Sequence, residues 1–300
     1  MVYRLIRIAF QLMSFIPLTC GQFLGKLLAV PFFVVPLART DISRDNILKS
    51  FKGLMGRDEA ERLNRRVLRH FGQMLFEIPH ILRMSRDNLD KYVYFVNGQH
   101  LQRAKEMGKG VLILTGHFGN WEFMSAAVPL CFGDMAVIAR PIDFQPLDRM
   151  INEVRSRFGL EIIPKQRAMR KILTALKHKK PVGILLDQNV DWYEGVFVDF
   201  LDRWACTNKG LALLAMKTGA PVIPAFSVKQ KDGRYCVTFG EQVRLIRTGD
   251  KTKDVEENTI LFTSIIEKYV RRYPDQWFWF HNRWKTVPYC RFPDEIIKEA

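Results

Sequence analysis

The sequence predicts an α/β fold in which a mostly parallel central sheet is flanked by helices. Short continuous apolar runs such as VLILT (111–115) and VGILLD (182–187) have the pattern of strands that are buried on both faces. Segments with helical spacing of apolar residues separate these runs, and this alternation is typical of parallel βαβ units. An apolar start adds an N-terminal helical membrane anchor to the prediction.

The apolar start extends from Ile8 to Leu37 and is interrupted by Lys26 and by prolines. Two arginines precede it, as in a signal peptide, but the run is too long for one and no small-residue cleavage site follows. We therefore predict that residues 1–40 form a retained membrane anchor or a pair of interfacial helices, with basic flanks facing the cytoplasm. An ordinary buried pair of helices is the alternative.

Residues 41–300 are expected to form the main domain, and its elements follow in order. Helices are predicted within 41–92 and over 146–159, 167–180, 208–219 and 255–273, and strands over 111–115, 135–140, 161–164, 182–187, 221–228 and 235–239. The helix at 208–219 is expected to open after Thr207 as its N-cap and to close at Gly219.

Charge composition restricts the kinds of partner. Lysine and arginine number 46 against 31 acidic residues, a formal net charge of +15. This imbalance favours an anionic membrane surface, nucleic acid, phosphorylated substrates or an acidic carrier protein. No nucleic-acid-binding module is recognisable, so nucleic acid is not an expected partner. The five cysteines form no CxxC pair, which argues against a zinc site and favours a reducing compartment.

The stretch LTGHFGNWEF (114–123) holds the candidate base. Gly116 and Gly119 flank His117 and its neighbour, and glycine allows close approach by another molecule. A lone histidine here could equally cap a helix start as a structural group.

Glu122 follows His117 by five residues, and a helix is expected to start at Asn120, a good N-cap residue. On one helix, side chains five apart point about 140° away from each other. Contact therefore requires the histidine to fold back from the loop over the helix start. We expect the Glu122 carboxylate to hold one ring nitrogen and so raise the basicity of the other.

Other chemistries do not match the spacing of the sequence. No GxSxG nucleophile elbow, HExxH zinc motif, GxGxxG or Walker motif is present. DQNVDWYEG (187–195) begins like a calcium loop, but Trp192 occupies the required glycine position and Val198 the place of the bidentate glutamate. The remaining prediction is a base without a protein nucleophile, with neither metal nor cofactor and with direct transfer to a substrate hydroxyl.

GHFGNWE resembles the HX4(D/E) motif of glycerolipid acyltransferases. Its sequence is similar to that of the motif in the lipid A biosynthesis lauroyl/myristoyl acyltransferases of Gram-negative bacteria. The resemblance covers nearly the whole chain. It includes the blocks RDNILKSF (44–51), GKGVLILTGHFGNWE (108–122), IARPIDFQPLDRMINEVRSRFG (138–159), LLDQN (185–189), GVFVDFLDRWACTNKGLALLAMKTGAPVIP (195–224) and DQWFWFHNRWK (275–285). It implies that residues 41–300 are a glycerolipid-acyltransferase-like catalytic domain.

The resemblance also implies roles for the residues in the first motif. His117 is expected to be the general base and Glu122 its orienting partner. Gly119 and Asn120 are expected to line the substrate-binding site.

Roles in the later blocks are implied in the same way. Arg140 is expected to hold a phosphate or the developing oxyanion, Asp187 to orient other site groups, and Pro221 to have a structural role. Asp187 as an ordinary carboxylate at a strand end is the alternative. Asp199 and Asp202 depart from the more apolar, glycine-rich family pattern, which bears on the acyl-chain groove.

By resemblance, the donor is an acyl carrier protein thioester and the acceptor a hydroxyl of a lipid A precursor at the cytoplasmic face of the bacterial inner membrane. Another glycolipid or an aminolipid is the neighbouring alternative, and a non-enzymatic basic protein that binds membrane or nucleic acid is a distant one. The basic helix 167–180 is expected to meet the carrier or anionic headgroups, or to be merely solvated. The aromatic tail WFWFHNRW (277–284) is expected to pack against the sheet, with Arg283 near the lipid phosphates.

Overall fold

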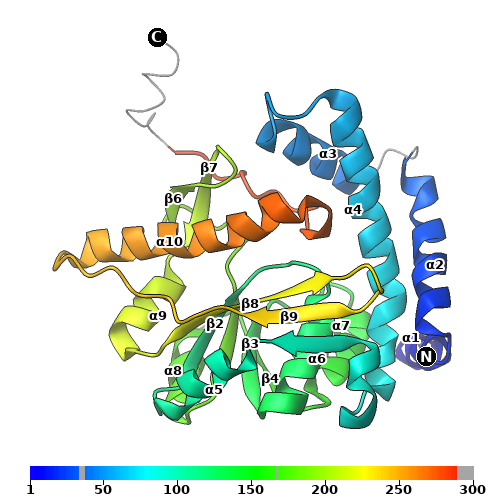
Figure 1. Ribbon diagram of the computed structural model, residues 1–300, viewed down its shortest axis with the longest axis horizontal. Helices are drawn as coiled ribbons and strands as arrows, with labels where there is room; N and C mark the ends of the chain where they lie inside the picture. Colours follow the sequence, from blue (N-terminus) through cyan, green and yellow to red (C-terminus); the bar gives the residue numbers. More distant parts are fainter. Residues whose placement is uncertain (34–37, 167, 289–300) are drawn as a thin grey trace.

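A seven-stranded sheet forms the centre of the computed structural model, which describes residues 1–33, 38–166 and 168–288. The strand order is β1-β9-β8-β2-β5-β3-β4 (Figure 1). The strands are β1 (Val93–Val96), β2 (Val111–Thr115), β3 (Met135–Ala139), β4 (Leu160–Pro164), β5 (Pro181–Leu185), β8 (Val222–Lys229) and β9 (Tyr235–Phe239). Neighbours are parallel except the antiparallel pair β8–β9. The predicted α/β class with a mostly parallel sheet is confirmed.

Helices cover both faces of this sheet. They are α1 (Val2–Met13), α2 (Leu18–Leu28), α3 (Ala38–Ser50), α4 (Arg57–Glu77), α5 (Gly98–Glu106), α6 (Trp121–Phe132), α7 (Gln145–Ser156), α8 (Ala168–Lys177), α9 (Gly210–Thr218) and α10 (Lys251–Arg272). Short 3-10 turns lie at Val30–Phe33, Ile78–Arg83, Arg86–Lys91 and Pro274–Gln276.

Strand β2 shows why the apolar runs are continuous. Leu112 and Leu114 belong to a core cluster that includes side chains of α8, α9 and α10. Val111 and Ile113 belong to a second cluster, with side chains of α5, α6 and α7. Since successive side chains of a strand point to opposite faces, a strand covered on both sides needs apolar residues at every position.

A hairpin that sequence periodicity did not reveal follows β5. Strands β6 (Gly195–Asp199) and β7 (Trp204–Asn208) pair antiparallel, apart from the main sheet. Thr207 lies within β7, so the predicted N-cap at this residue is wrong, and α9 begins at Gly210 with Lys209 in the cap position. The predicted end of this helix at Gly219 is confirmed by a left-handed backbone there, with φ of 64°.

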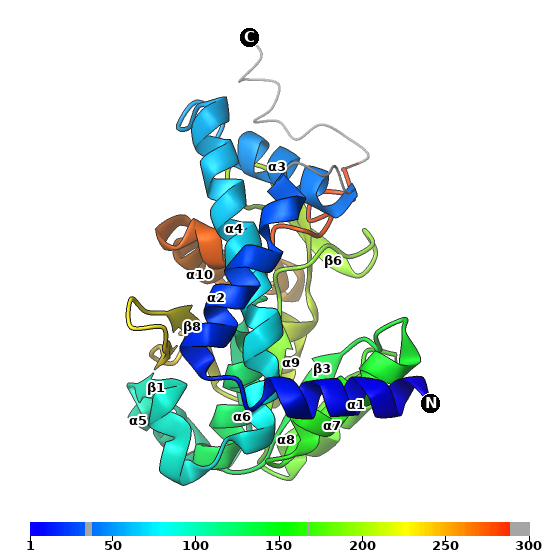
Figure 2. The ribbon, with the colours of Figure 1, turned by 90° about the vertical axis from the view of Figure 1, so that its right-hand side faces the viewer.

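The N-terminal segment forms two short helices at a sharp angle to each other. Figure 2 shows α1 lying across the end of α4, with α2 running alongside α4. Within the described part of the chain, no helix has both the length and the apolar character needed to cross a membrane. The spanning form of the predicted anchor is therefore unsupported. Residues 34–37 of the apolar segment lie outside the described residues.

Candidate active site

The register of two parallel strands brings a histidine and an aspartate together. Thr115 of β2 lies opposite Leu185 of β5. His117 and Asp187 each follow two residues later, at the carboxyl ends of the strands, where sites form in α/β sheets. The His117 Nδ1 lies 2.9 Å from Asp187 Oδ1, and the His117 backbone N–H donates to Asp187 Oδ2 at 2.8 Å.

Asp187 is buried and fixes the state of the imidazole. The Trp277 indole N–H donates to its Oδ2 at 2.8 Å. Burial alone would raise the pKa of the Asp187 carboxyl, but the His117 ring and backbone N–H and the nearby His281 hold that pKa well below its usual range. An ionised Asp187 accepts the proton on Nδ1 of neutral His117, which leaves Nε2 free to accept another.

Glu122 does not contact His117, so the predicted orienting contact is wrong. Its carboxylate instead binds Arg155 of α7, with Arg155 Nε 2.8 Å from Oε2 and Nη2 2.5 Å from Oε1. The Trp121 indole N–H also donates to Oε1 at 3.0 Å. The physical reason is direction: in the first turn of α6, Glu122 points to α7, while His117 turns toward β5.

The Glu122–Arg155 pair is largely buried, with side-chain exposures of 6% and 16%. Burial by itself would lower the pKa of the Arg155 guanidinium, but the adjacent Glu122 carboxylate raises that pKa above its ordinary value. The two side chains form an ion pair, and both face the same cavity as His117.

That cavity has a volume of about 700 Å³. Its polar lining includes His117, Glu122, Arg155 and Gln188. Apolar side chains from the sheet and helices complete it, among them Ile113, Val128, Met135, Val137, Leu160 and Leu211. The Gln188 side chain also lines the cavity, and its amide nitrogen makes a long contact of 3.4 Å with His117 Nε2, so this ring nitrogen faces the cavity. His117 keeps 21% of its side chain exposed, which makes it reachable from the cavity.

Gly119 and Asn120, which were predicted to bind substrate, are not among the residues that line this cavity. Asn120 is completely buried. Its Oδ1 accepts from the backbone N–H of Phe123 at 2.9 Å as the N-cap of α6, and its Nδ2 donates to Glu77 at 3.0 Å. The predicted N-cap is confirmed. Substrate contact is not possible for a side chain that is occupied and enclosed in this way.

Arg140 lies at the rim of the cavity, beyond the end of β3. Its side chain is 74% exposed, and its guanidinium pairs with Asp143 at 2.9 Å. A rim position suits a bound phosphate better than an oxyanion beside His117. Asp199 and Asp202, the departures from the family pattern, lie in the β6–β7 hairpin and do not line the cavity.

The aromatic tail packs inside the molecule, as predicted. Trp277 and Trp279 are fully buried, and the Phe278 backbone N–H donates to the His117 carbonyl at 3.0 Å. Arg283 is also fully buried and donates to the Cys206 carbonyl at 2.8 Å. Its predicted place near lipid phosphates is therefore wrong. Burial lowers the pKa of the Arg283 guanidinium to about 10.

Two contributors were not singled out from the sequence. Arg155 lies in a block that carries the family resemblance, and Trp277 lies in the aromatic tail, so each was within a quoted motif without a role. For Asp187, the useful signal was its position at the end of the predicted strand 182–187, since His117 likewise stands just after the end of the predicted strand 111–115. Pairing the predicted strands 111–115 and 182–187 as neighbours would have placed these two side chains together.

A family model described as bacterial lipid A biosynthesis acyltransferase matches residues 2–286. A lipid A biosynthesis acyltransferase of Haemophilus influenzae is 24% identical over 217 residues, which cover 71% of this chain and 66% of that protein. The lipid A biosynthesis palmitoleoyltransferase of Escherichia coli is 26% identical over 253 residues, covering 83% and 80%. A phosphatidylinositol mannoside acyltransferase of Mycolicibacterium smegmatis is 22% identical over 231 residues, covering 76% and 74%.

Proposed function

Because the chain belongs to the bacterial lipid A biosynthesis acyltransferase family, we propose that this acyltransferase moves a fatty acyl chain from an acyl carrier protein thioester to a hydroxyl of a lipid A precursor. His117 acts as the general base. One observation carries the proposal: Nδ1 of His117 is held by buried Asp187, while Nε2 faces a cavity of about 700 Å³. A non-enzymatic role does not fit the family.

The reaction needs no nucleophile from the protein. Nε2 of His117 accepts the proton of the acceptor hydroxyl as that oxygen attacks the thioester carbonyl carbon. The tetrahedral intermediate then expels the carrier thiolate, which takes the proton from the imidazolium, so that an ester and a free thiol result. General-base assistance of this kind contributes about 10²–10⁴-fold to rate. The Asp187 carboxylate stabilises the transient imidazolium.

The cavity supplies room for an acyl chain beside the base. Its apolar walls match a hydrocarbon tail, and the charges of Glu122 and Arg155 form a polar part of its lining. The cationic rim, with Arg140 and Lys165, suits phosphates of either the carrier's prosthetic arm or the lipid acceptor. Next to this rim, α8 exposes Arg170, Lys171 and Lys177. We propose that this helix meets the acidic acyl carrier protein.

The N-terminal helices are proposed to lie on the cytoplasmic face of the bacterial inner membrane. Tyr3, Ile6 and Phe10 of α1 pack against the core, but the helix also carries apolar residues on its outer face. The exposed apolar side chains are Val2, Leu5, Ile8, Leu12 and Phe15 around α1 and Phe23, Leu24, Leu27 and Leu28 on α2. Such a surface, with exposed Arg4, Arg7 and Lys26 beside it, suits an anionic bilayer surface from which the acceptor arrives.

This membrane placement predicts co-flotation with vesicles that contain anionic lipid. Leu5→Ser with Ile8→Ser should reduce flotation, since two side chains of the outer face of α1 are removed. Leu54→Ser, at an exposed leucine after α3 and away from α1, is the control and should float like the unmodified protein. Equal flotation of all three proteins would contradict this placement.

A second acceptor class follows from a specific observation. The similarity to a phosphatidylinositol mannoside acyltransferase over 76% of this chain leaves another glycolipid as the alternative acceptor for the same chemistry. The donor cavity and the base would then be unchanged, and the acceptor side of the rim would differ in what it binds.

Both possibilities are tested in one experiment. Purified protein is incubated with a panel of acyl carrier protein donors and either a lipid A precursor or a mannosylated phospholipid, and products are identified by mass spectrometry. Acylation of the lipid A precursor is expected, and its loss in folded His117→Ala. Turnover retained by His117→Ala would exclude the proposed base, and acylation of only the mannosylated lipid would favour the second acceptor.

A further inference from the structure

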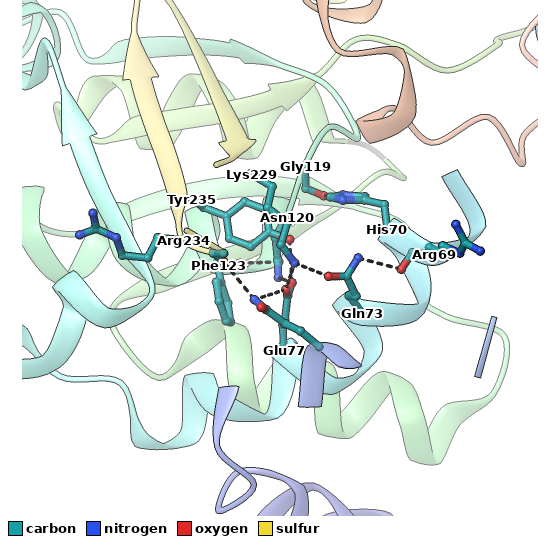
Figure 3. Close-up of polar contacts among 12 residues, drawn as sticks. Arg69, His70, Gln73, Glu77, Gly119, Asn120, Phe123, Lys229, Arg234 and Tyr235 are labelled. Carbon is teal, nitrogen blue, oxygen red and sulfur yellow. Dashed lines mark hydrogen bonds and ion pairs between the residues drawn. The ribbon is translucent and has the colours of Figure 1, made fainter. Parts of the chain in front are cut away.

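Glu77, at the end of α4, accepts four side-chain hydrogen bonds. Its Oε1 accepts from Gln22 at 2.9 Å and from Lys229 at 2.6 Å. Its Oε2 accepts from Asn120 at 3.0 Å and from the Tyr235 hydroxyl at 2.7 Å. Figure 3 shows Lys229, Asn120 and Tyr235 converging on this carboxylate from different elements. The cluster therefore joins α2, α4, β8, β9 and the start of α6.

The centre of this cluster is shielded from solvent, and none of its residues lines the active-site cavity. Glu77, Asn120 and Tyr235 are completely buried, and none of them lines the cavity. Burial, followed by the Glu77 charge and hydrogen bond, raises the pKa of the Tyr235 hydroxyl well above its usual value. Burial also lowers the pKa of Lys229 despite its contact with Glu77. A buried carboxylate so completely bonded has no direct route to substrate.

Asn120 connects Glu77 to the loop between β2 and α6, which holds His117. Its Nδ2 is bound by Glu77, and its Oδ1 caps α6 through the Phe123 N–H. His117 lies three residues before Asn120 and Glu122 two residues after it. Fixing Asn120 therefore fixes the backbone from which both cavity-facing groups extend.

The neighbouring residue leaves the loop little freedom to adjust. Gly119 has a φ of 57°, and a Cβ there would lie 1.8 Å from the Ser227 carbonyl oxygen. Its N–H donates to the Gln276 carbonyl at 2.8 Å, and its own carbonyl lies 3.2 Å from His70 Nε2. With one side of the loop held against β8 and the 276–278 segment, displacement at Asn120 has to move His117 or Glu122.

We propose that Glu77 is a positioning residue of the acyltransferase site, which acts through Asn120 to hold His117 and Glu122 in their working arrangement. The inference rests on the proposed function, because it concerns the efficiency of the same reaction. It differs from a purely structural role in one respect: breaking the Glu77–Asn120 bond should lower kcat in protein that remains folded.

The first variant is Asn120→Asp. Aspartate caps a helix as well as asparagine does, so the bond to the Phe123 N–H survives. The new carboxylate, however, faces Glu77 across the former 3.0 Å hydrogen bond, and like charges in a buried site repel. Displacement of the loop by about 1 Å is expected to lower kcat by roughly 10²-fold, with KM little changed.

The second variant restores the contact by exchanging the two groups. In Glu77→Gln with Asn120→Asp, the glutamine amide can donate to the new carboxylate and to the Tyr235 hydroxyl, which turns from donor to acceptor. The glutamine oxygen can still accept from Gln22 and Lys229. The double variant is expected to recover most of the lost kcat. Glu77→Gln alone is expected to have a lower kcat than the unmodified protein, because the glutamine NH2 group then faces the donating Asn120 amide and Tyr235 hydroxyl. Hydrogen exchange of residues 114–124 should rise in Asn120→Asp and fall again in the double variant.

The control is Asn258→Asp in α10. This asparagine is also fully buried, with its Nδ2 donating to the Ile246 carbonyl at 2.8 Å. The same chemical change there should lower the melting temperature and leave kcat unchanged below it. Acylation by the unmodified protein tests the proposed function separately. If that protein is active and Asn120→Asp keeps its kcat, or if the double variant is no better than the single one, the positioning role is excluded.

Discussion

Asp187 and Glu77 are both buried carboxylates that accept several hydrogen bonds. They differ in whether the side chains that they bind line the active-site cavity. Asp187 binds His117, whose other ring nitrogen faces the cavity. Glu77 binds Lys229, Tyr235, Gln22 and Asn120, and none of these lines the cavity. A buried carboxylate with several hydrogen bonds therefore marks a reactive centre only if its partner is reachable from the cavity and can change protonation.

The charges of the partners sharpen this contrast. The imidazole of His117 has a second ring nitrogen, Nε2, on the cavity side, and a neutral imidazole can accept a proton there during a reaction. Lys229 is an ammonium 2.6 Å from Glu77, a fixed ion pair within the protein. Glu122 is intermediate, because it faces the cavity but is paired with the permanent cation Arg155. Its arrangement suits electrostatics and shape better than proton transfer.

The largest effect on kcat is expected at Asp187, the carboxylate that binds His117. Asp187→Asn keeps the size of the side chain but removes the charge that selects the Nδ1–H tautomer of His117. A loss of kcat of about 10²–10⁴-fold is expected, as for a misoriented general base. Steady-state assays of folded protein measure it, and a loss below tenfold would show that Asp187 does not orient the base.

The next effect is expected at the intermediate pair. Arg155→Leu leaves Glu122 buried without its cation, and breaking such a pair costs about 3–5 kcal/mol of stability. Replacing both residues by leucine should return much of that stability, since apolar pairs often substitute for buried ion pairs. Urea unfolding measures both variants. If the double variant is stable but inactive, the pair serves the reaction; if it is stable and active, the pair is only structural.

A smaller effect is expected from moving α2, which holds Gln22 against Glu77. A Cβ at Gly25 would lie 2.4 Å from the Gly72 carbonyl oxygen, so Gly25→Ala must push α2 away from α4. Loss of the Gln22 bond should lower kcat by less than Asn120→Asp does. Gly56→Ala is the matched control, since a Cβ there meets nothing within 4 Å. Equal kcat of the two variants would show that the position of α2 on α4 does not affect the loop that holds His117.

The smallest effect is expected on the pH dependence of stability, through His70, whose Nε2 lies beside the Gly119 carbonyl. Burial, and then the Lys229 charge, lower the pKa of His70 below the ordinary value of 6.5 for histidine. The unfolded chain therefore binds a proton at His70 more tightly than the folded chain does. The stability that the folded protein gains from keeping His70 neutral is complete above pH 6.5 and is lost as the pH falls below it. Unfolding free energies at neutral and mildly acid pH should differ less in His70→Gln than in the unmodified protein or in a His178→Gln control. The same difference in all three would contradict this sign.

Much of the fold could be predicted from local sequence. The apolar runs that became β2 and β5 are readable because burial on both faces demands apolar residues at every position. The β6–β7 hairpin was missed because Asp199, Asp202 and Arg203 interrupt any simple alternation in GVFVDFLDRWACT. A pair of N-terminal helices was predicted from the apolar segment, while the packing of α2 on α4 depends on the close approach of Gly25 and Gly72.

The candidate site divides in the same way. The sequence by itself determined that His117 is held in a glycine-flanked turn after a buried strand, that Asn120 caps the next helix, and that Asp187 ends another strand. Only the tertiary structure decided that Asp187, not Glu122, holds His117, that Glu122 pairs with Arg155, and that Asn120 faces Glu77. The physical reason is that these contacts depend on strand register and helix packing, which join residues 33 to 70 positions apart, whereas spacing along the chain reports only on neighbours.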